Sequence, residues 1–426
     1  MGWITPLGDN IESVWQGLLS GASGIGATTR FDASTFPTTF SAEVKNFDLA
    51  RYLGSDTEIH QTASLNTRFA LAAARMAWDN ANLSGYPDLD PTRVGVYLGG
   101  GEGPIDFDNF TAAAVNGWDR QANNGAGDLD ARRWVEVAAA RLTAVTEFEQ
   151  DPNMAAGHIA CLFNAQGPSL NTLTACAAST QAIGEATHVI RRGDADVIIS
   201  GGTHSMLHPF GVTGFNRLTA LSTRNDAPTT ASRPFDRTRD GFVLGEGAAI
   251  VILEDYEHAR QRGATCHAEI SGFGSTADAF RVTDMHDEGR GGLAAIALAL
   301  KDAGLKPEDI DYISAHGTST EENDKIESRA ILRALGDSAP QVPVSSIKSM
   351  MGHLIAAAGA TEVIASVLTI RDGIIPPTTN YEQPDPNCPL DYVPNKPRKA
   401  NVRTVLSNSF GFGGQNDTLI IRKIED

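Results

Sequence analysis

The sequence predicts an α/β protein, in which strands and helices alternate along the chain. Segments rich in β-branched residues alternate with segments of helical periodicity, and this is the pattern of that fold class. The 42 glycines among 426 residues favour a compact protein with many tight turns over a helical bundle. With 41% hydrophobic and 20% charged residues, the chain can form one large core or two packed domains.

Local patterns predict the individual elements. Helices are expected at residues 67–82 and 292–303, and strands at residues 94–98, 196–200, 248–253, 310–313 and 401–406. We expect Gly201 and Gly202 to stop the strand that precedes them. Residues 117–151 differ from the rest, because an Asn-Gly-rich run is followed by a charged helical stretch. This segment is predicted to be an inserted excursion.

Charge and cysteine usage exclude several classes of function. A formal net charge of −18 argues against binding to nucleic acid or to an anionic membrane, although a local basic patch can still receive an acidic partner. Neither a long apolar run nor a secretory signal is evident, so we expect a cytoplasmic protein. The four cysteines have no zinc-like spacing and are expected to be free thiols: Cys161, Cys176, Cys266 and Cys388.

Reactive side chains follow predicted strands at three strand–helix junctions. Cys176 stands between a β-prone stretch and a helical pattern, where the helix dipole favours a thiolate. His316 follows the strand at 310–313, and Lys348 and His353 open an alanine-rich helix. Taken singly, the cysteine and the histidines are more consistent with structural roles in the core, and the lysine with a position on the surface. Together, one cysteine and two histidines at the carboxyl ends of strands suggest covalent thioester catalysis.

The glycine-rich turn at 407–414 holds two phenylalanines. It lacks the lysine of a phosphate loop, and its glycines do not fit the dinucleotide fingerprint. By itself it is consistent with a structural turn.

Six segments carry a family resemblance. They are Thr-Ala-Cys at 174–176, residues 232–236, residues 240–247, His-Gly-Thr-Ser-Thr at 316–320, Lys-Ser-Met-Met-Gly-His at 348–353 and Asn-Ser-Phe-Gly-Phe-Gly-Gly at 408–414. These segments closely resemble the β-ketoacyl-acyl-carrier-protein synthases of the thiolase-like superfamily, and most of all synthase II and its polyketide relatives. The resemblance implies a five-layered αβαβα fold of two similar halves. Residues 1–260, with the insertion near 117–151, would carry the cysteine, and residues 261–426 the two histidines.

The resemblance also implies a mechanism. Cys176 would take the acyl group from acyl carrier protein, while His316 and His353 bind the malonyl thioester and stabilise the enolate formed as carbon dioxide leaves. Whether His316 also acts as an acid or base is left open. The backbone N–H groups of Cys176 and Phe412 would form the oxyanion hole, and Phe412 would gate the cysteine. No metal and no bound cofactor are expected, since phosphopantetheine on the carrier protein holds the substrates.

Further roles are implied for the surrounding residues. Lys348 would tune the charge of the site. Its support network would contain Glu362 together with Asp324 or Glu327. The phosphopantetheine channel would be lined by Thr283, Thr318 and Thr320, and the acyl pocket by Glu102 and Phe215. The resemblance further implies a homodimer.

The sequence departs from the family pattern in four places. The usual first strand is missing before Gly2, so the first sheet is expected to lack a central strand, unless the start of the chain is misplaced. Residues 117–151 are longer than usual. Glu102 replaces an apolar pocket residue, which indicates either a polar acyl chain or a carboxylate turned to solvent. Residues 58–62 lack the basic side chains that often help to receive carrier protein.

Two other functions are weighed against the condensing enzyme. A non-decarboxylating acyltransferase is disfavoured by the paired histidines, because thiolases use a second cysteine and Cys388 has the wrong context. A partner subunit like a chain-length factor is disfavoured because such subunits lack the cysteine. The sequence leaves open the acyl chain length, the pathway, and whether the dimer is formed by two identical chains.

Overall fold

Two five-stranded sheets carry the fold of the computed structural model, which describes residues 1–101, 103, 105–281 and 285–425. The first sheet has the order β7-β4-β8-β9-β1, with β1 (Gly2–Ile4), β4 (Val94–Gly99), β7 (Ser169–Thr172), β8 (Val197–His204) and β9 (Gly247–Glu254). The second has the order β12-β11-β15-β16-β10, with β10 (Glu269–Ala277), β11 (Tyr312–Ser314), β12 (Val344–Ser345), β15 (Thr404–Gly411) and β16 (Gln415–Arg422).

The two sheets have the same topology. In each, the second strand along the chain lies between two parallel neighbours, and the fifth strand pairs antiparallel with both the fourth and the first. The chain therefore consists of two similar halves, as predicted.

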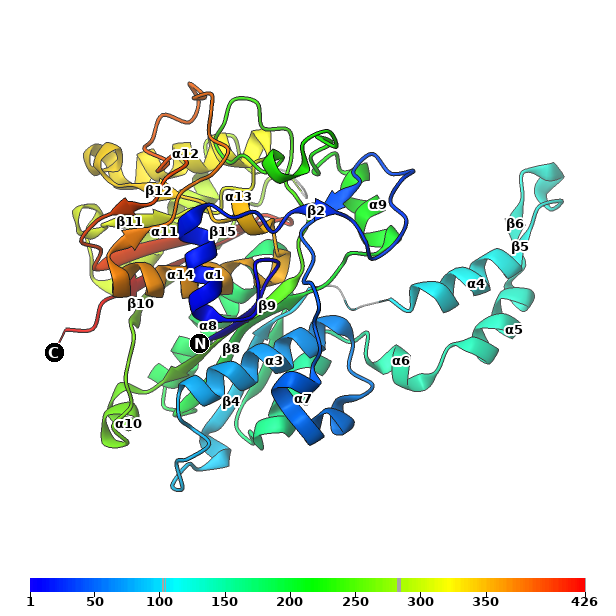
Figure 1. The fold of residues 1–426 in the computed structure, drawn as a ribbon, viewed down its shortest axis with the longest axis horizontal. Helices are drawn as coiled ribbons and strands as arrows, with labels where there is room; N and C mark the ends of the chain where they lie inside the picture. The colour runs from blue at the N-terminus through cyan, green and yellow to red at the C-terminus, as the bar shows by residue number, and fades with distance from the viewer. Residues whose placement is uncertain (102, 104, 282–284, 426) are drawn as a thin grey trace.

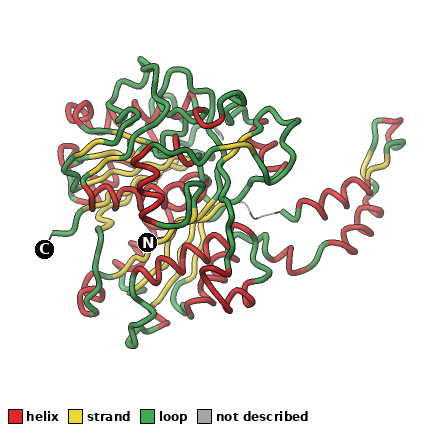
Figure 2. Tube along the Cα trace, viewed as in Figure 1, coloured by secondary structure: helices red, strands yellow, loops and turns green. Residues whose placement is uncertain are grey.

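Helices cover the sheets in layers, which Figure 2 shows as red coils around two yellow sheets. Between the sheets lie α8 (Ala178–Arg191) and α14 (Ala358–Asp372), each in contact with both of them. The outer faces are covered by α3 (Leu65–Asn80) and α7 (Met154–Phe163) on the first sheet, and by α11 (Arg290–Ala303) and then α12 (Glu321–Leu335) on the second. This five-layered arrangement agrees with the predicted fold class.

The remaining elements of the body are short. They are α1 (Ile11–Ser20), β2 (Gly26–Ala27), β3 (Phe40–Ser41), α2 (Ala50–Leu53), α9 (Pro209–Arg217), α10 (Tyr256–Gln261), α13 (Lys348–Met351), β13 (Ile374–Ile375) and β14 (Arg398–Lys399). Of these elements, α13 is buried. Among the described residues, no helix is both long and apolar enough to cross a bilayer.

The two central helices pack closely because one of them presents a glycine. A Cβ atom on Gly359 of α14 would lie 1.9 Å from Oγ1 of Thr180 on α8. The backbone N–H of Ala360 donates to Oγ of Ser179 at 2.9 Å, and the hydroxyls of Thr180 and Ser409 lie 2.7 Å apart. These buried hydrogen bonds fix one half of the chain against the other.

Strand β8 runs further than the sequence indicated. Gly201 and Gly202 were expected to stop it, but the strand passes through both and ends at His204. A Cβ on Gly202 would come within 2.5 Å of the carbonyl oxygen of Ala356, so glycine is required there by close packing and not by a turn.

The expectation of a missing first strand is wrong. Gly2–Ile4 forms β1 and pairs antiparallel with Ala248–Ile250 of β9, at the edge of the sheet and not at its centre. The pairing is nevertheless short. The corresponding strand β10 pairs along the whole of β16, whereas β1 covers three of the eight residues of β9.

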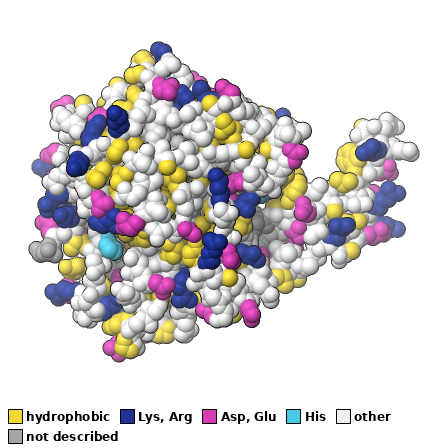
Figure 3. All heavy atoms as spheres, in the orientation of Figure 1, with side chains coloured by type: hydrophobic (Ala, Val, Ile, Leu, Met, Phe, Trp, Pro, Cys, Tyr) yellow, Lys and Arg dark blue, Asp and Glu magenta, His cyan; other side chains and the backbone are white. Residues whose placement is uncertain are grey.

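The predicted excursion is an arm that projects from the body (Figure 1). It begins ten residues earlier than expected and contains α4 (Phe107–Gly117), β5 (Trp118–Asp119), β6 (Asp128–Leu129), α5 (Ala131–Arg141) and α6 (Ala144–Phe148). Helices α4 and α5 pack on each other, with the rings of Phe110 and Trp134 in edge contact. Figure 3 shows the arm standing clear of the remaining surface.

Candidate active site

Cys176 lies in a sharp turn between β7 and α8. Ala175 precedes it with a φ of 48°, in the left-handed region that a non-glycine residue seldom adopts. The turn places Cys176, which is 3% exposed, at the amino end of α8, where the helix dipole favours negative charge on sulfur. The local geometry is therefore that of a nucleophile presented at a strand–helix junction.

The loop after β15 lies directly over this turn. A Cβ on Gly411 would meet the carbonyl oxygen of Thr174 at 2.8 Å and the backbone nitrogen of Cys176 at 3.3 Å. Glycine at 411 thus permits the close approach, and Phe412 packs against the apolar cluster that contains Cys176. This proximity is compatible with an oxyanion hole shared by the two backbone segments.

The second half repeats the turn. Ile355 has a φ of 43° and leads into α14, as Ala175 leads into α8. The residue that occupies the position of Cys176 there is Ala356. His353 comes just before this second turn, so the two turns bring the cysteine and a histidine together from opposite halves.

Cys176, His316 and His353 meet in one buried cluster. The Cys176 sulfur and one ring nitrogen of each histidine lie within 4.8 Å of one another, and the two imidazole centroids are 5.3 Å apart. Nδ1 of His353 accepts a hydrogen bond from the backbone N–H of Ile355 at 3.3 Å, which places the ring proton on Nε2. Among the described residues, that Nε2 has no partner. It is therefore a donor ready for a substrate oxygen.

Burial keeps both histidines neutral. The pKa of His316 and the pKa of His353 both lie well below the usual value of 6.5, first because of desolvation and then because of the nearby Lys348 ammonium. Neutral imidazoles can donate to an oxyanion without first losing a proton.

A pH profile tests this arrangement. Because the pKa values of His316 and His353 are depressed, both rings stay unprotonated at pH 6, where an ordinary histidine is mostly charged. We expect the rate of the reaction at this site to show no acidic limb with a midpoint near 6.5 between pH 8 and pH 5.5. A fall centred near 6.5 would contradict the assignment, provided that circular dichroism shows the protein folded throughout.

Lys348 is buried with a carboxylate beside it. Its Nζ is in contact with Glu362 of α14 and donates to the carbonyl oxygen of His316 at 2.7 Å. Burial raises the pKa of Glu362 to about 7, and the lysine opposes that rise. The Lys348 ammonium thus contacts both the Glu362 carboxylate and the backbone carbonyl of His316.

The two other predicted support residues hold different segments. Glu327 accepts from the backbone N–H groups of His316 and Gly317, each at 2.8 Å, and burial raises its pKa to about 7. Asp324 forms an ion pair with Arg239 at 3.7 Å and accepts from the backbone of the adjoining loops, so the contact that the structure gives it is not with Lys348.

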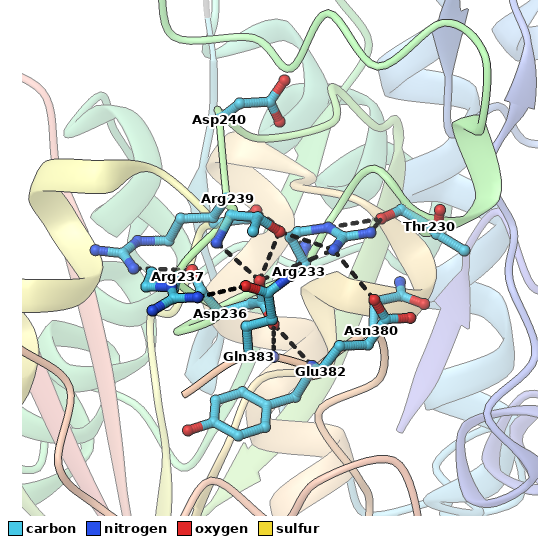
Figure 4. Close-up of polar contacts among 12 residues, drawn as sticks. Thr230, Arg233, Asp236, Arg237, Arg239, Asp240, Asn380, Glu382 and Gln383 are labelled. Atoms are coloured by element: carbon cyan, nitrogen blue, oxygen red, sulfur yellow. Dashed lines mark hydrogen bonds and ion pairs between the residues drawn. The ribbon is translucent and has the colours of Figure 1, made fainter. Parts of the chain in front are cut away.

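A network centred on Asp236 fixes the loop beside His316. Figure 4 shows Arg233 beside it and the backbone of Glu382 and Gln383 on its other side, and Arg239 donates to the carbonyl oxygen of Asp236 at 2.9 Å. Asp236 accepts from those two backbone N–H groups at 2.7 and 2.6 Å. Arg239 in turn donates to the carbonyl oxygen of Thr320 at 2.9 Å, which ties the segment after His316 to the first half of the chain. This network accounts for Arg233 and Asp236 in the segment at 232–236.

The remaining predicted residues are placed as follows. The hydroxyls of Thr318 and Thr320 lie 3.0 Å apart, and Thr320 also caps α12. Phe215 packs on Phe242, whose ring in turn contacts His353, so it adjoins the site. Glu102 and Thr283 lie outside the described residues, and their roles stay predictions.

A thiolate and two imidazoles are also groups that can bind zinc as ligands, so the absence of a metal stays a prediction too.

Three residues near the site were not predicted. Asn408 donates to Glu327 at 3.2 Å, Phe242 packs on His353, and His204 ends β8. The first two lie in motifs already noted, so their positions could have been proposed from the resemblance. His204 was missed because the preceding glycines were taken as the end of the strand.

Comparison with known proteins agrees with this geometry. The chain matches the family description "Beta-ketoacyl synthase, N-terminal domain" over residues 1–259 and "Beta-ketoacyl synthase, C-terminal domain" over residues 267–382. It belongs to the β-ketoacyl synthase family. The predicted family is thereby confirmed, and the chain is a condensing enzyme of the acyltransferase type.

Similar β-ketoacyl synthases include two curated proteins named 3-oxoacyl-[acyl-carrier-protein] synthase 2. That of Coxiella burnetii (strain RSA 493 / Nine Mile phase I) is 43% identical, with 100% of this chain and 98% of the relative covered. That of Synechocystis sp. (strain ATCC 27184 / PCC 6803 / Kazusa) is 42% identical, with 100% and 97% covered.

Two solved structures extend the comparison. A β-ketoacyl synthase from Burkholderia phymatum STM815 has a TM-score of 0.86 at 32% identity, and a type II PKS ketosynthase in complex with its acyl-carrier protein has a TM-score of 0.84 at 34% identity. Each alignment covers 100% of this chain and 98% of the other.

Proposed function

We propose that this β-ketoacyl synthase joins an acyl group on Cys176 to malonyl-acyl carrier protein by decarboxylative Claisen condensation, in fatty acid or polyketide-type biosynthesis. The observation that carries the proposal is the cluster of Cys176, His316 and His353, with a sulfur and two neutral imidazoles within 4.8 Å. A thiolate and two N–H donors are the groups that this reaction needs.

The first step transfers the acyl group. The Cys176 sulfur attacks the thioester carbonyl of the acyl donor, and the phosphopantetheine thiolate leaves. The negative charge that develops on the carbonyl oxygen is stabilised by the backbone N–H groups of Cys176 and Phe412, which the close packing of Gly411 brings near each other.

The second step forms the carbon–carbon bond. His316 and His353 donate to the malonyl thioester oxygen. The bond to the carboxylate breaks, carbon dioxide leaves, and its electron pair becomes an enolate. The enolate carbon attacks the acyl carbonyl on Cys176, the new bond forms, and the cysteine thiolate is released. Whether His316 also moves a proton stays open.

Acyl carrier protein is the proposed partner, in the cytoplasm, and its phosphopantetheine arm is the only carrier group required. The names of the relatives and the complex of a similar ketosynthase with its carrier protein support this proposal. Thr318 and Thr320 are proposed to line the channel for that arm. The net charge of −18 and the lack of Lys and Arg at residues 58–62 do not favour docking of an acidic carrier protein, and Arg68 and Arg217 are the residues proposed to make the contact.

We also propose that two copies of the chain associate through the arm. The arm exposes apolar side chains that the body does not cover, namely Val115, Trp118, Leu129, Val135, Val145 and Phe148. Burial of such side chains against a second copy removes an exposed apolar surface that a monomer would leave in water.

An aspartate on the arm tests the dimer. Val115 is 68% exposed, and we expect Val115→Asp to convert a dimer into a monomer in sedimentation velocity, because a charge cannot be buried unpaired. Leu298→Asp on α11, at a side chain that is 44% exposed, is the control and should leave the mass unchanged. A wild-type monomer would contradict the proposal.

The function is tested by incubating the protein with malonyl-acyl carrier protein and a panel of acyl carrier proteins. Mass spectrometry should find acyl groups on Cys176 and a β-ketoacyl product, with release of carbon dioxide. Acylation without carbon dioxide release would overturn condensation in favour of simple acyl transfer.

A further inference from the structure

His204 is a buried histidine that the proposed mechanism does not use. It is the last residue of β8 and is 1% exposed. Neither Nδ1 nor Nε2 has a hydrogen-bond partner among the described residues. Burial lowers the pKa of its ring to about 3, so it is a neutral imidazole with one donor and one acceptor, both unused.

Its neighbours along the strand are satisfied. The hydroxyl of Thr203 donates to the carbonyl oxygen of Asn66 at 2.6 Å, and that of Ser205 donates to Glu246 at 2.9 Å. Buried polar groups in folded proteins are nearly always paired, because an unpaired one costs free energy on leaving water. An unpaired imidazole between two satisfied hydroxyls therefore needs an explanation, and a ligand that supplies the missing partner is one.

The position of His204 points to the acyl chain as that ligand. Strands β7, β4 and β8 run parallel, and their carboxyl ends lead to Cys176, Gly101 and His204 in turn. The backbone of Gly101 lies against the ring, since a Cβ there would be 2.5 Å from Nδ1 of His204. On another side, Gly202 of the same strand lies against the carbonyl oxygen of Ala356, three residues after His353.

The surroundings are otherwise apolar. The chain leaving His204 continues into Leu207 and Val212, which belong to the same buried cluster as Cys176. Phe215 and Phe412 are only partly buried in that cluster, so they are the side chains that can yield when an acyl group enters. An alkyl chain on Cys176 would thus pass between apolar walls and come within reach of one hydrogen-bonding ring.

We propose that His204 is a specificity-determining residue that binds a hydroxyl or keto oxygen on the acyl chain carried by Cys176. The inference rests on the proposed function. A neutral imidazole suits a neutral oxygen, whereas a carboxylate would require a cation. The protein would therefore extend oxygenated acyl chains in preference to saturated ones of the same length.

The test compares matched substrates. Wild type and His204→Leu are given malonyl-acyl carrier protein with acyl-carrier proteins of one length, either saturated or bearing a single hydroxyl or keto group. We expect wild type to have a kcat/KM about tenfold higher for an oxygenated chain, the ratio that corresponds to one hydrogen bond between neutral groups. His204→Leu should remove this preference and improve the saturated substrate.

The ratio of kcat/KM for the oxygenated and saturated substrates distinguishes an effect on specificity from a general loss of structure. A merely structural role would lower both rates together and leave the ratio unchanged. His204→Gln, which keeps a donor and an acceptor, should retain part of the preference, and His267→Leu at an exposed histidine before β10 should retain all of it. Equal rates for both chains in wild type would overturn the inference but leave condensation standing, whereas no condensation with either chain would overturn the proposed function.

Discussion

Cys176→Ala is expected to abolish acylation and condensation while leaving a slow decarboxylation of malonyl-acyl carrier protein. Because the Cys176 sulfur is the proposed nucleophile, condensation should fall by at least about three orders of magnitude. The two imidazoles belong to other segments of the chain and can still bind the malonyl thioester, with the ring of His353 oriented by the backbone N–H of Ile355. Intact-protein mass and release of labelled carbon dioxide measure the two activities separately.

Cys388→Ala is the matched control. Cys388 is buried, and burial raises the pKa of its thiol to about 12, so it is an inert thiol in the core of the second half. Its replacement should leave acylation intact. If Cys176→Ala still gave a covalent acyl adduct, another residue would be the nucleophile and the mechanism would be wrong.

Lys348→Met is expected to lower the free energy of unfolding by about 3–5 kcal/mol. The change leaves Glu362, which is 1% exposed, without its ammonium partner. Burial already raises the pKa of this carboxyl to about 7, so Glu362 binds a proton more readily in the folded protein than in the unfolded chain. The loss should therefore be larger at pH 8, where the carboxylate is charged, than at pH 5.5. Denaturant unfolding at the two pH values measures it.

Removal of both charges distinguishes stability from catalysis. Lys348→Met combined with Glu362→Leu should recover most of the stability, since neither member of the pair is left alone. It should not recover condensation, because the donor to the carbonyl oxygen of His316 is still absent. Lys301→Met, at an exposed lysine of α11, is the control and should change stability by less than about 0.5 kcal/mol. Equal stability of Lys348→Met and wild type would contradict the coupling of the pair.

Residues set by local signals could be predicted from the sequence. Cys176 and His316 each follow a strand-like run and precede small residues, and His353 comes just before an alanine-rich helix, so these positions could be singled out without a structure. The layered halves followed from the resemblance and from the alternation of strands and helices.

Residues whose identity depends on contacts between distant segments could not be predicted from the sequence. A side chain at residue 202 would collide with the carbonyl oxygen of Ala356, and no feature of the sequence near residue 202 indicates this contact. Likewise Asp324 and Glu327 lie one turn apart on α12. Only the course of the loop that carries Arg239 decides that Asp324 meets the arginine while Glu327 meets the backbone of His316.

The duplicated turn makes the two halves unequal partners. The first half has a cysteine at 176, whereas the second half has an alanine at 356 and carries the two histidines. Neither half contains all three residues of the cluster, so we expect neither half to catalyse condensation alone. A slip of a single ångström between α8 and α14 would move the sulfur away from the imidazoles without altering either half. The contact of Gly359 with Thr180 therefore fixes the spacing between the two helices on which the site depends, although neither residue is proposed to touch substrate.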